Sequence, residues 1–286
     1  MPIQNIPELF LHSKNQNPEL FIYDFKMTSD VVKSKVNLTL NMFSFLQNGE
    51  KKVHFEDAFV EVNNHQSVLI KSGNCLMTEL LNKEEIYFCK LLFFTNKNCS
   101  DFLEKHNYLV EKTQNKTATE NPFFVIENDD FIDSFATSIS SILKLNSKAT
   151  SPLLGLKFEE IMLYLSHKYG VSFINYLLSL TSPENNSSFR KIVESNINSN
   201  LSLVEIAFLA NMSLSTFKRH FEKQYQTNPG KWLQQKRLNQ AKLILEKGIK
   251  KPNEIFADFG YNNLSNFSIA FKNEFGCSPK QCKTKI

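Results

Sequence analysis

The sequence predicts an α+β protein, with an N-terminal antiparallel β-barrel and flanking helices followed by an all-helical C-terminal domain. The chain has 286 residues, which corresponds to about two domains at roughly 150 residues each. Short apolar runs separated by turn residues fill its first part, whereas its last third has helical apolar spacing and an internal repeat. We therefore expect the barrel over about 15–125, its flanking helices over about 126–182 and the second domain over 183–286.

The strand-like runs of the first part are short and rich in β-branched and aromatic residues. Asn48-Gly49 lies between two such runs and predicts a hairpin, because both residues accept the positive φ of a tight turn. Several short strands with turns between them are typical of an antiparallel sandwich or a small barrel. The expected strands are Leu20–Lys26, Val36–Leu46, Lys52–Phe55, Ala58–Val62, Ser67–Lys71, Cys75–Leu80 and Glu85–Thr95.

From Asn128 onward the apolar spacing becomes helical. Asn128 is a suitable N-cap, and Asp129 and Asp130 suit the positive end of a helix dipole. These helices either pack on their own barrel or mediate self-association. The other expected segments are a helix between Ser151-Pro152 and Gly170, a helix over Phe173–Leu180 and a polar interdomain linker over Thr181–Ser188.

Composition and isolated residues exclude several classes of protein. The chain is 42% hydrophobic and 22% charged, as in ordinary globular proteins. No uncharged apolar stretch reaches the ~18 residues of a membrane span, and residues 1–5 lack the basic and apolar pattern of a secretory signal, so we expect none. His54 and His65 stand alone and the five cysteines lack Cys-x-x-Cys spacing, so we expect reduced thiols, no catalytic residues, no metal site and no cofactor.

The charge of the chain is divided unevenly. Residues 183–286 carry 16 Lys and Arg against 8 Asp and Glu, whereas residues 1–182 carry 17 against 21. All three arginines (Arg190, Arg219 and Arg237) lie in the basic third. Arginine offers a planar fork for phosphate oxygens and guanine edges. This charge pattern favours an anionic polymer as partner of the C-terminal domain, and a solvated basic surface without such a partner is the alternative.

The basic third contains a repeat at a constant offset of 50 residues. Leu214–Phe221 and Leu264–Phe271 share a leucine, a serine and two phenylalanines at matching positions. In each copy the phenylalanines are spaced i, i+4 and would pack inward, which leaves small polar and basic residues outside. A second apolar helical pattern lies upstream of each copy. Each copy is therefore predicted to form a helix-turn-helix, the first over about 201–223 and the second over about 251–273.

Local signals define the helices of this repeat. Ser202 and Glu205 form a capping box for a helix over about Leu203–Ala210, and Ser213 caps the next helix, to about Lys223. The second copy is expected to have a helix over Pro252–Phe259, a turn at Gly260 and a helix capped by Asn262 or Asn263. Between the copies, a helix is expected with Asn228 as its N-cap and Pro229 at its first position, ending near Gly248. Its ~17 residues give ~25 Å. This length is shorter than a DNA turn of ~34 Å. The two outer helices could therefore enter successive major grooves only if the DNA is bent or if the helices lie closer together than one DNA turn.

These residues resemble the DNA-binding domain of the AraC/XylS family of bacterial transcription regulators over about Phe189–Lys283. Two departures are a bulky Phe256, where the family has a small residue, and the low charge of the second outer helix. Arg237, in an Arg-Leu-x-x-Ala stretch, is expected to form a structural ion pair rather than a phosphate contact. The residues that carry the resemblance are Ile206-Ala207, Met212–Phe221, Pro229, Arg237-Leu238, Ala241, Gly260-Tyr261, Ser265–Phe267, Phe271-Lys272, Phe275-Gly276 and Ser278-Pro279.

The resemblance implies a cupin-like N-terminal barrel, seven C-terminal helices and two recognition helices, at about Ser213–Lys223 and Asn263–Asn273. Base or phosphate contacts are implied for Ser213, Ser215, Thr216, Lys218 and Arg219 in the first, and for Asn262, Asn263, Ser265, Asn266 and Ser268 in the second.

The sequence therefore predicts a non-enzymatic, sequence-specific transcription activator in the bacterial cytoplasm, associated with the nucleoid. Its expected partners are double-stranded DNA, a second copy through the N-terminal region, RNA polymerase, and an effector that is a small molecule or a protein. A protein-interaction module at the N-terminus and an enzyme with a DNA-binding tail, such as a repair methyltransferase, are the alternatives. A large apolar cavity in the barrel would favour a small-molecule effector, and a filled barrel with an exposed apolar patch would favour a protein.

Overall fold

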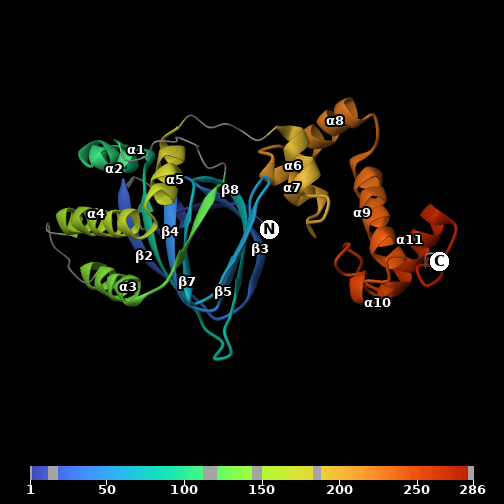
Figure 1. Cartoon of the computed structure of the whole chain (residues 1–286), viewed down its shortest axis with the longest axis horizontal. Helices are drawn as coiled ribbons and strands as arrows, with labels where there is room; N and C mark the ends of the chain where they lie inside the picture. The colour runs from blue at the N-terminus through green and yellow to red at the C-terminus, as the bar shows by residue number, and fades with distance from the viewer. Residues whose placement is uncertain (1, 12–18, 112–120, 144–149, 183–187, 283–286) are drawn as a thin grey trace. The chain divides into compact units, whose positions relative to one another are not determined.

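The structure is a computed structural model that describes residues 2–11, 19–111, 121–143, 150–182 and 188–282. It divides into two compact units, Met1–Asn185 and Asn186–Ile286. Figure 1 shows the first unit with its strands and helices and the second as helices only. Residues 183–187 of the expected linker lie outside the described residues.

The first unit contains two five-stranded sheets. Sheet A has the strand order β1-β3-β8-β5-β6 and sheet B has the order β10-β7-β4-β9-β2. All pairs are antiparallel except β1 with β3. The strands are β1 (Gln4–Ile6), β2 (Leu20–Met27), β3 (Val31–Leu38), β4 (Asn41–Asn48), β5 (Glu50–His54), β6 (Phe59–Val62), β7 (Gln66–Ile70), β8 (Gly73–Leu80), β9 (Tyr87–Phe94) and β10 (Phe123–Glu127).

The predicted fold class is confirmed: a β-rich, cupin-like unit with flanking helices precedes an all-helical unit. The strands form two facing sheets rather than one continuous hydrogen-bonded ring. One apolar cluster lies between the sheets, with Val36 and Val53 from sheet A and Met42, Ile70 and Phe93 from sheet B.

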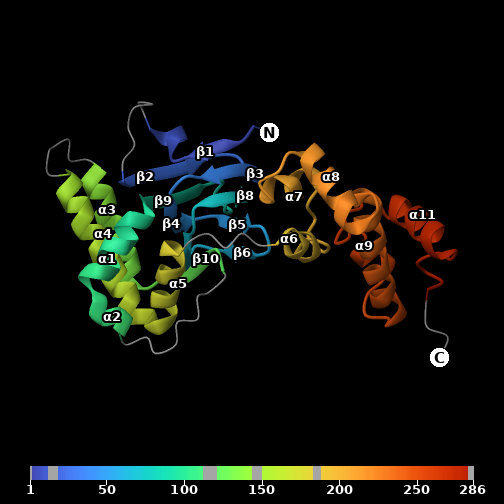
Figure 2. The same ribbon diagram turned by 90° about the horizontal axis from the view of Figure 1, so that it is seen from above.

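Helices cover the other face of sheet B, as Figure 2 shows. Phe43, Phe45 and Leu92 of this sheet pack in one cluster with helical residues such as Phe135 and Ile161. Because both faces of sheet B are buried, its central strands are nearly continuous apolar runs instead of alternating ones. The helices are α1 (Asn96–Lys105), α2 (Asn107–Glu111), α3 (Asp130–Leu143), α4 (Thr150–Tyr169) and α5 (Val171–Thr181), and a 3-10 helix, η1, spans Glu8–Phe10.

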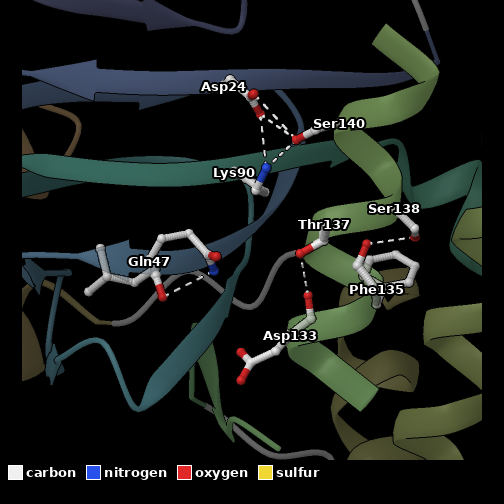
Figure 3. A network of polar contacts seen from close by, with 9 residues as sticks. Asp24, Gln47, Lys90, Asp133, Phe135, Thr137, Ser138 and Ser140 are labelled. Carbon is white, nitrogen blue, oxygen red and sulfur yellow. Dashed lines mark hydrogen bonds and ion pairs between the residues drawn. The ribbon is translucent and has the colours of Figure 1, made fainter. Parts of the chain in front are cut away.

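A polar contact on this face joins α3 to sheet B (Figure 3). Lys90 of β9 is buried and donates a hydrogen bond to the hydroxyl of Ser140 on α3. The Ser140 hydroxyl donates to Asp24 of β2 at 3.2 Å, and the Lys90 ammonium lies 3.9 Å from the same carboxylate. The buried lysine thus has an acidic partner and a hydroxyl partner, as a buried charge requires.

Three local predictions in the first unit were wrong. Asn48-Gly49 does not form a hairpin, because β4 lies in sheet B and β5 lies in sheet A, so the turn passes between sheets. The run Val36–Leu46 is divided into β3 and β4 by a turn at residues 39 and 40. Asp129, rather than Asn128, caps α3 by accepting from the amide of Ile132 at 3.0 Å.

The second unit contains six helices in the part that the structure describes. Ser202, Ser213, Asn228 and Asn263 cap α7, α8, α9 and α11 through their side chains, as expected. The α-helix predicted over Pro252–Phe259 ends early, and its last residues form turns. The helices are α6 (Phe189–Ser195), α7 (Leu203–Leu209), α8 (Leu214–Tyr225), α9 (Pro229–Glu246), α10 (Pro252–Ile255) and α11 (Leu264–Phe275).

The shortening of α10 coincides with Phe256. The equivalent residue of the first copy is Ala207, which is buried inside α7. Phe256 is only partly buried and lies at the edge of the apolar cluster of the second copy. A large side chain cannot occupy the buried position of Ala207 without displacing its neighbours.

Arg237 of α9 connects the two copies. Its guanidinium donates hydrogen bonds to the carbonyls of Ile197, Ser199 and Leu201, at 2.8, 2.7 and 3.1 Å. A Cβ atom on Gly260, in the turn of the second copy, would lie 3.2 Å from another guanidinium nitrogen. Burial lowers the pKa of Arg237. The residue is structural, but its partners are backbone carbonyls rather than the acid of the expected ion pair.

We predict that Gly49→Ala destabilises the protein by about 2 kcal/mol or more, since a side chain at positive φ costs roughly 1–3 kcal/mol. Gly49 has a φ of +92°, and its Cβ would lie 2.4 Å from the carbonyl oxygen of Leu80. Urea unfolding measures the change. The control is Gly155→Ala in α4, which meets no atom within 4 Å and should stabilise the helix by about 0.5–1 kcal/mol. Equal stability of the Gly49 variant and the wild type would contradict the strain argument.

Candidate nucleic-acid interface

The first candidate recognition helix, α8, is held by its apolar face. Phe217 and Phe221 are fully buried, one helical turn apart. Phe189 of α6 contacts Phe217 with ring centroids 5.2 Å apart, and Trp232 of α9 contacts Phe221 at 5.5 Å. These contacts fix the orientation of α8, so its opposite face points away from the apolar core.

The predicted contact residues of α8 divide into two groups. Ser213 is occupied as the N-cap: its hydroxyl accepts from the Thr216 amide at 3.2 Å and lies 2.9 Å from the Ser215 hydroxyl. Lys218 and Arg219 are exposed, and neither forms an ion pair or side-chain hydrogen bond within the described residues. Thr216 is half-buried and Ser215 is exposed. Among the predicted contact residues of α8, these two cations are therefore available to a ligand.

The second candidate recognition helix, α11, is built in the same way. Phe267 and Phe271 are buried in the cluster of the second copy. Asn263 caps the helix by accepting from the Asn266 amide at 2.8 Å, and the Ser268 hydroxyl donates to the Leu264 carbonyl at 2.8 Å. Asn262, Ser265 and Asn266 are exposed.

The turns before the two recognition helices differ by one residue. In the first, the amide of Met212 donates to the carbonyl of Ala207 at 2.9 Å, and Asn211 has a φ of +56°. In the second, Tyr261 donates to Phe256 at 3.1 Å, and Gly260 has the positive φ. Both turns contain one residue in the left-handed conformation. The first cap then follows two residues after the left-handed residue, and the second follows three residues after it.

The outer faces of α8 and α11 are chemically different. α8 carries Lys218, Arg219 and Lys223, whereas Lys272 is the basic residue of α11. Ile269 stands where the repeat offset places Arg219, and it is 60% exposed. An exposed isoleucine at this position was missed in the sequence analysis, although the offset of 50 pairs it directly with Arg219. The methyl group of thymine is an apolar feature that such a side chain can contact in the major groove.

The structure places the predicted residues as two groups, one at the start of each recognition helix, with α9 between them in the chain. It contains no group of three or more His, Cys, Asp or Glu side chains suited to a metal among the residues that it describes. None of its described helices has the length and hydropathy that crossing a membrane requires.

Two family models match separate parts of the chain. The description "ExsA N-terminal regulatory domain" applies to the model that matches residues 41–176, and "Helix-turn-helix domain" applies to the model that matches residues 206–285. The first covers most of sheets A and B with helices α1 to α4, and the second begins within α7 and covers the rest of the first repeat copy and the second copy.

Curated relatives match across both units. The virulence regulon transcriptional activator VirF of Yersinia enterocolitica is 28% identical over 203 residues, which is 69% of this chain and 74% of that protein. The thermoregulatory protein LcrF of Yersinia pestis is 27% identical over the same shares. The XylDLEGF operon transcriptional activator of Pseudomonas putida is 30% identical over 111 residues, 35% of each chain. A crystal structure of ToxT from Vibrio cholerae covers 92% of this chain and 97% of its own, with 13% identity and a TM-score of 0.38.

Two capped helix-turn-helix copies, exposed cations on the first recognition helix and matches to both a regulatory and a helix-turn-helix model agree with one another. The chain belongs to the AraC/XylS family of bacterial, sequence-specific DNA-binding transcription regulators.

Proposed function

We propose that the chain is an activator that inserts α8 and α11 into successive major grooves of one DNA site. The observation that carries this proposal is the pair of equivalent helices whose inner faces are fixed by buried phenylalanines and whose outer faces begin with exposed polar residues. On α8, Lys218 and Arg219 would contact phosphates or guanine edges. On α11, Asn262, Ser265 and Asn266 would contact base edges or phosphates.

In this proposal, three residues both stabilise their own helix and contact DNA: Ser213, Asn263 and Ser268. Each already makes a hydrogen bond that stabilises its own helix. A hydroxyl or amide side chain has further donor and acceptor capacity, so contact with a phosphate is compatible with capping. We propose that these residues, with Ser215 and Thr216, orient the helix start on the DNA backbone, which sets register more than sequence preference.

We further propose that binding bends the DNA. The 18 residues of α9 correspond to a helix of about 27 Å, which is shorter than one DNA turn of ~34 Å. Bending toward the protein shortens the distance between successive major grooves on one face.

The N-terminal unit is proposed to control DNA binding and to join two copies of the chain. Leu153 and Leu156 of α4 are exposed, Leu156 at 64%, on a helix whose other residues pack against α3 and α5. Two exposed leucines on one helix are suited to self-association. A dimer would present four recognition helices to two copies of the site, in direct or inverted order.

Activation, rather than repression, is supported by the names of the relatives VirF and the XylDLEGF regulator, which describe activators. Contact with RNA polymerase is part of that proposal, as is a nucleoid-associated location in the bacterial cytoplasm. We propose that the chain catalyses no reaction, since the relatives named are regulators. A protein effector at the N-terminal unit is the alternative to a small molecule.

We predict that Arg219→Ala weakens specific DNA binding more than Asn266→Ala does. Loss of an arginine contact to a base or phosphate costs about 1–3 kcal/mol, and loss of a phosphate contact also reduces the salt slope by about 1. Fluorescence anisotropy of the full chain on sites selected from random DNA, titrated against salt, measures both. The control is Arg190→Ala, which removes another exposed arginine, one that is paired with Glu194 at 2.8 Å. A larger loss for the Asn266 variant would contradict the dominance of α8.

We predict that Ile269→Ala weakens binding by about fourfold, the equivalent of one lost methylene contact of about 0.8 kcal/mol. Replacing thymines of the second half-site by deoxyuridine removes the proposed methyl partner. The wild-type protein should bind that DNA more weakly than the thymine-containing DNA. The Ile269→Ala variant should bind both DNAs equally well. The matched control is Ile249→Ala, because Ile249 is also exposed, at 64%, but lies outside both recognition helices. If deoxyuridine affects the wild type and the Ile269 variant equally, Ile269 does not contact thymine.

We predict that Leu156→Glu shifts the protein from dimer to monomer, because a charge cannot be buried between two copies without a partner. Sedimentation velocity of the full chain over a range of concentrations measures the change. Ile86→Glu is the control, since Ile86 is an exposed apolar residue (45%) in the turn between β8 and β9. A wild type that sediments as a monomer at every concentration, or equal effects of both substitutions, would remove α4 as the dimer interface.

A further inference from the structure

The first unit contains a cavity between its two sheets, bounded by the N-terminal segment. Its volume is about 240 Å³. Most of its wall is apolar, with Phe10 of η1, Phe25 of β2, Met42 of β4 and Leu91 of β9 among the lining residues. Two other lining residues, Gln4 and Leu9, are exposed, so the wall formed by the N-terminal segment lies at the protein surface.

One ion pair lies in this apolar wall. Lys51 of β5 and Glu79 of β8 are directly opposite in sheet A, and both line the cavity. The Lys51 ammonium is 2.6 Å from the Glu79 carboxylate, and the Lys51 side chain is 1% exposed. Tyr87 donates a second hydrogen bond to the same carboxylate oxygen at 3.2 Å. Burial opposes the charge of Lys51, but the Glu79 carboxylate outweighs it and raises the pKa of the lysine.

The hydrogen bonds of Lys51 are incomplete. An ammonium has three donors. One donates to Glu79 and one faces the sulfur of Met77 at 3.9 Å, which is a weak acceptor. The third has no acceptor among the described residues. Ser34 is another buried polar residue of the same wall. A buried donor without an acceptor is unfavourable, and a ligand in the cavity can supply one.

The pairing of Lys51 with Glu79 limits the charge of that ligand. A carboxylate that approached Lys51 would also approach the Glu79 carboxylate, and an ammonium would approach Lys51. Like charges in a buried site are strongly unfavourable. A neutral carbonyl oxygen accepts from the free ammonium donor without either repulsion.

We propose that this cavity binds a small, largely apolar, uncharged molecule through one carbonyl-type acceptor that completes the hydrogen bonding of Lys51 and lies beside Ser34. The volume sets the size: an apolar cavity of about 150 Å³ holds benzene, so about 240 Å³ holds roughly ten non-hydrogen atoms. The inference rests on the proposed control by the N-terminal unit only for its effect on DNA binding. Ligand binding itself depends on the cavity alone.

Three probes of about this size test whether the ligand must be uncharged and must have a carbonyl acceptor. They are ethyl hexanoate as a neutral ester, octanoate as its isomeric acid and butylbenzene as a hydrocarbon. Calorimetric titration of the full chain should give binding of the ester. Butylbenzene should bind about tenfold more weakly, the worth of one hydrogen bond to a charged group, and octanoate should bind more weakly than the ester. Failure of all three probes to bind, or tighter binding of octanoate, would overturn the proposal.

Two variants locate the site. Ser34→Leu fills the cavity and should abolish ester binding, whereas Ser34→Ala keeps the space and should retain it. The double variant with Lys51→Met and Glu79→Gln leaves no buried charge and should bind the ester only as tightly as butylbenzene. Unchanged ester affinity in the Ser34→Leu protein or in the double variant contradicts the assignment. Circular dichroism establishes that each variant is folded.

DNA binding in the same samples separates this inference from the proposed function. Wild-type protein that binds its selected DNA site but none of the three probes refutes the cavity assignment alone. Wild-type protein that binds the ester but shows no preference for any DNA over random competitor refutes the proposed function alone. A change in DNA affinity on adding the ester, absent in the Ser34→Leu variant, supports both.

Discussion

The buried guanidinium of Arg237 is the interaction on which the arrangement of the second unit depends. It stands on α9 and binds three carbonyls of the segment that leads into the first helix-turn-helix copy. The same group lies against Gly260 in the turn of the second copy. A side chain that contacts both copies fixes how each sits on the common helix. Lysine is not an equivalent replacement, because its compact ammonium lacks the rigid planar fork with which arginine spreads its donors over several acceptors.

Sheet B has a comparable role in the first unit. Because both of its faces are buried, its residues belong alternately to the cluster under the helices and to the cluster between the sheets. Leu91 lines the cavity, Lys90 on the same strand binds Ser140 of α3, and Leu92 packs under the helices. A ligand that displaces Leu91 therefore moves β9, the strand whose Lys90 forms a hydrogen bond with Ser140 of α3 (Figure 3). Population shift requires such a difference in contacts between the bound and free states.

The sequence was most informative where the interactions are local. Ser202, Ser213 and Asn228 each cap a helix through an atom a few residues away, so the signal and the structure coincide. Asn48-Gly49 was misinterpreted because the turn geometry is local but the sheet to which each flanking strand belongs is not. The pair of Lys51 and Glu79 could not be predicted, since its members are 28 residues apart and meet only when β5 pairs with β8. For the same reason the cavity, whose wall comes from both sheets and the N-terminal segment, has no sequence signal.

The difference between the two recognition helices follows from the repeat itself. Duplication preserves a partly buried leucine and two buried phenylalanines, which hold each helix on its neighbours, and leaves the outer positions free to change. Arg219 and Ile269 occupy one such position. A cation gains affinity from any phosphate, and its contribution falls with salt. An isoleucine gains only from an apolar partner, which on DNA is the thymine methyl group. The first copy is thus suited to supply affinity and the second to supply selectivity, and each needs the other because α9 and Arg237 hold them as one unit.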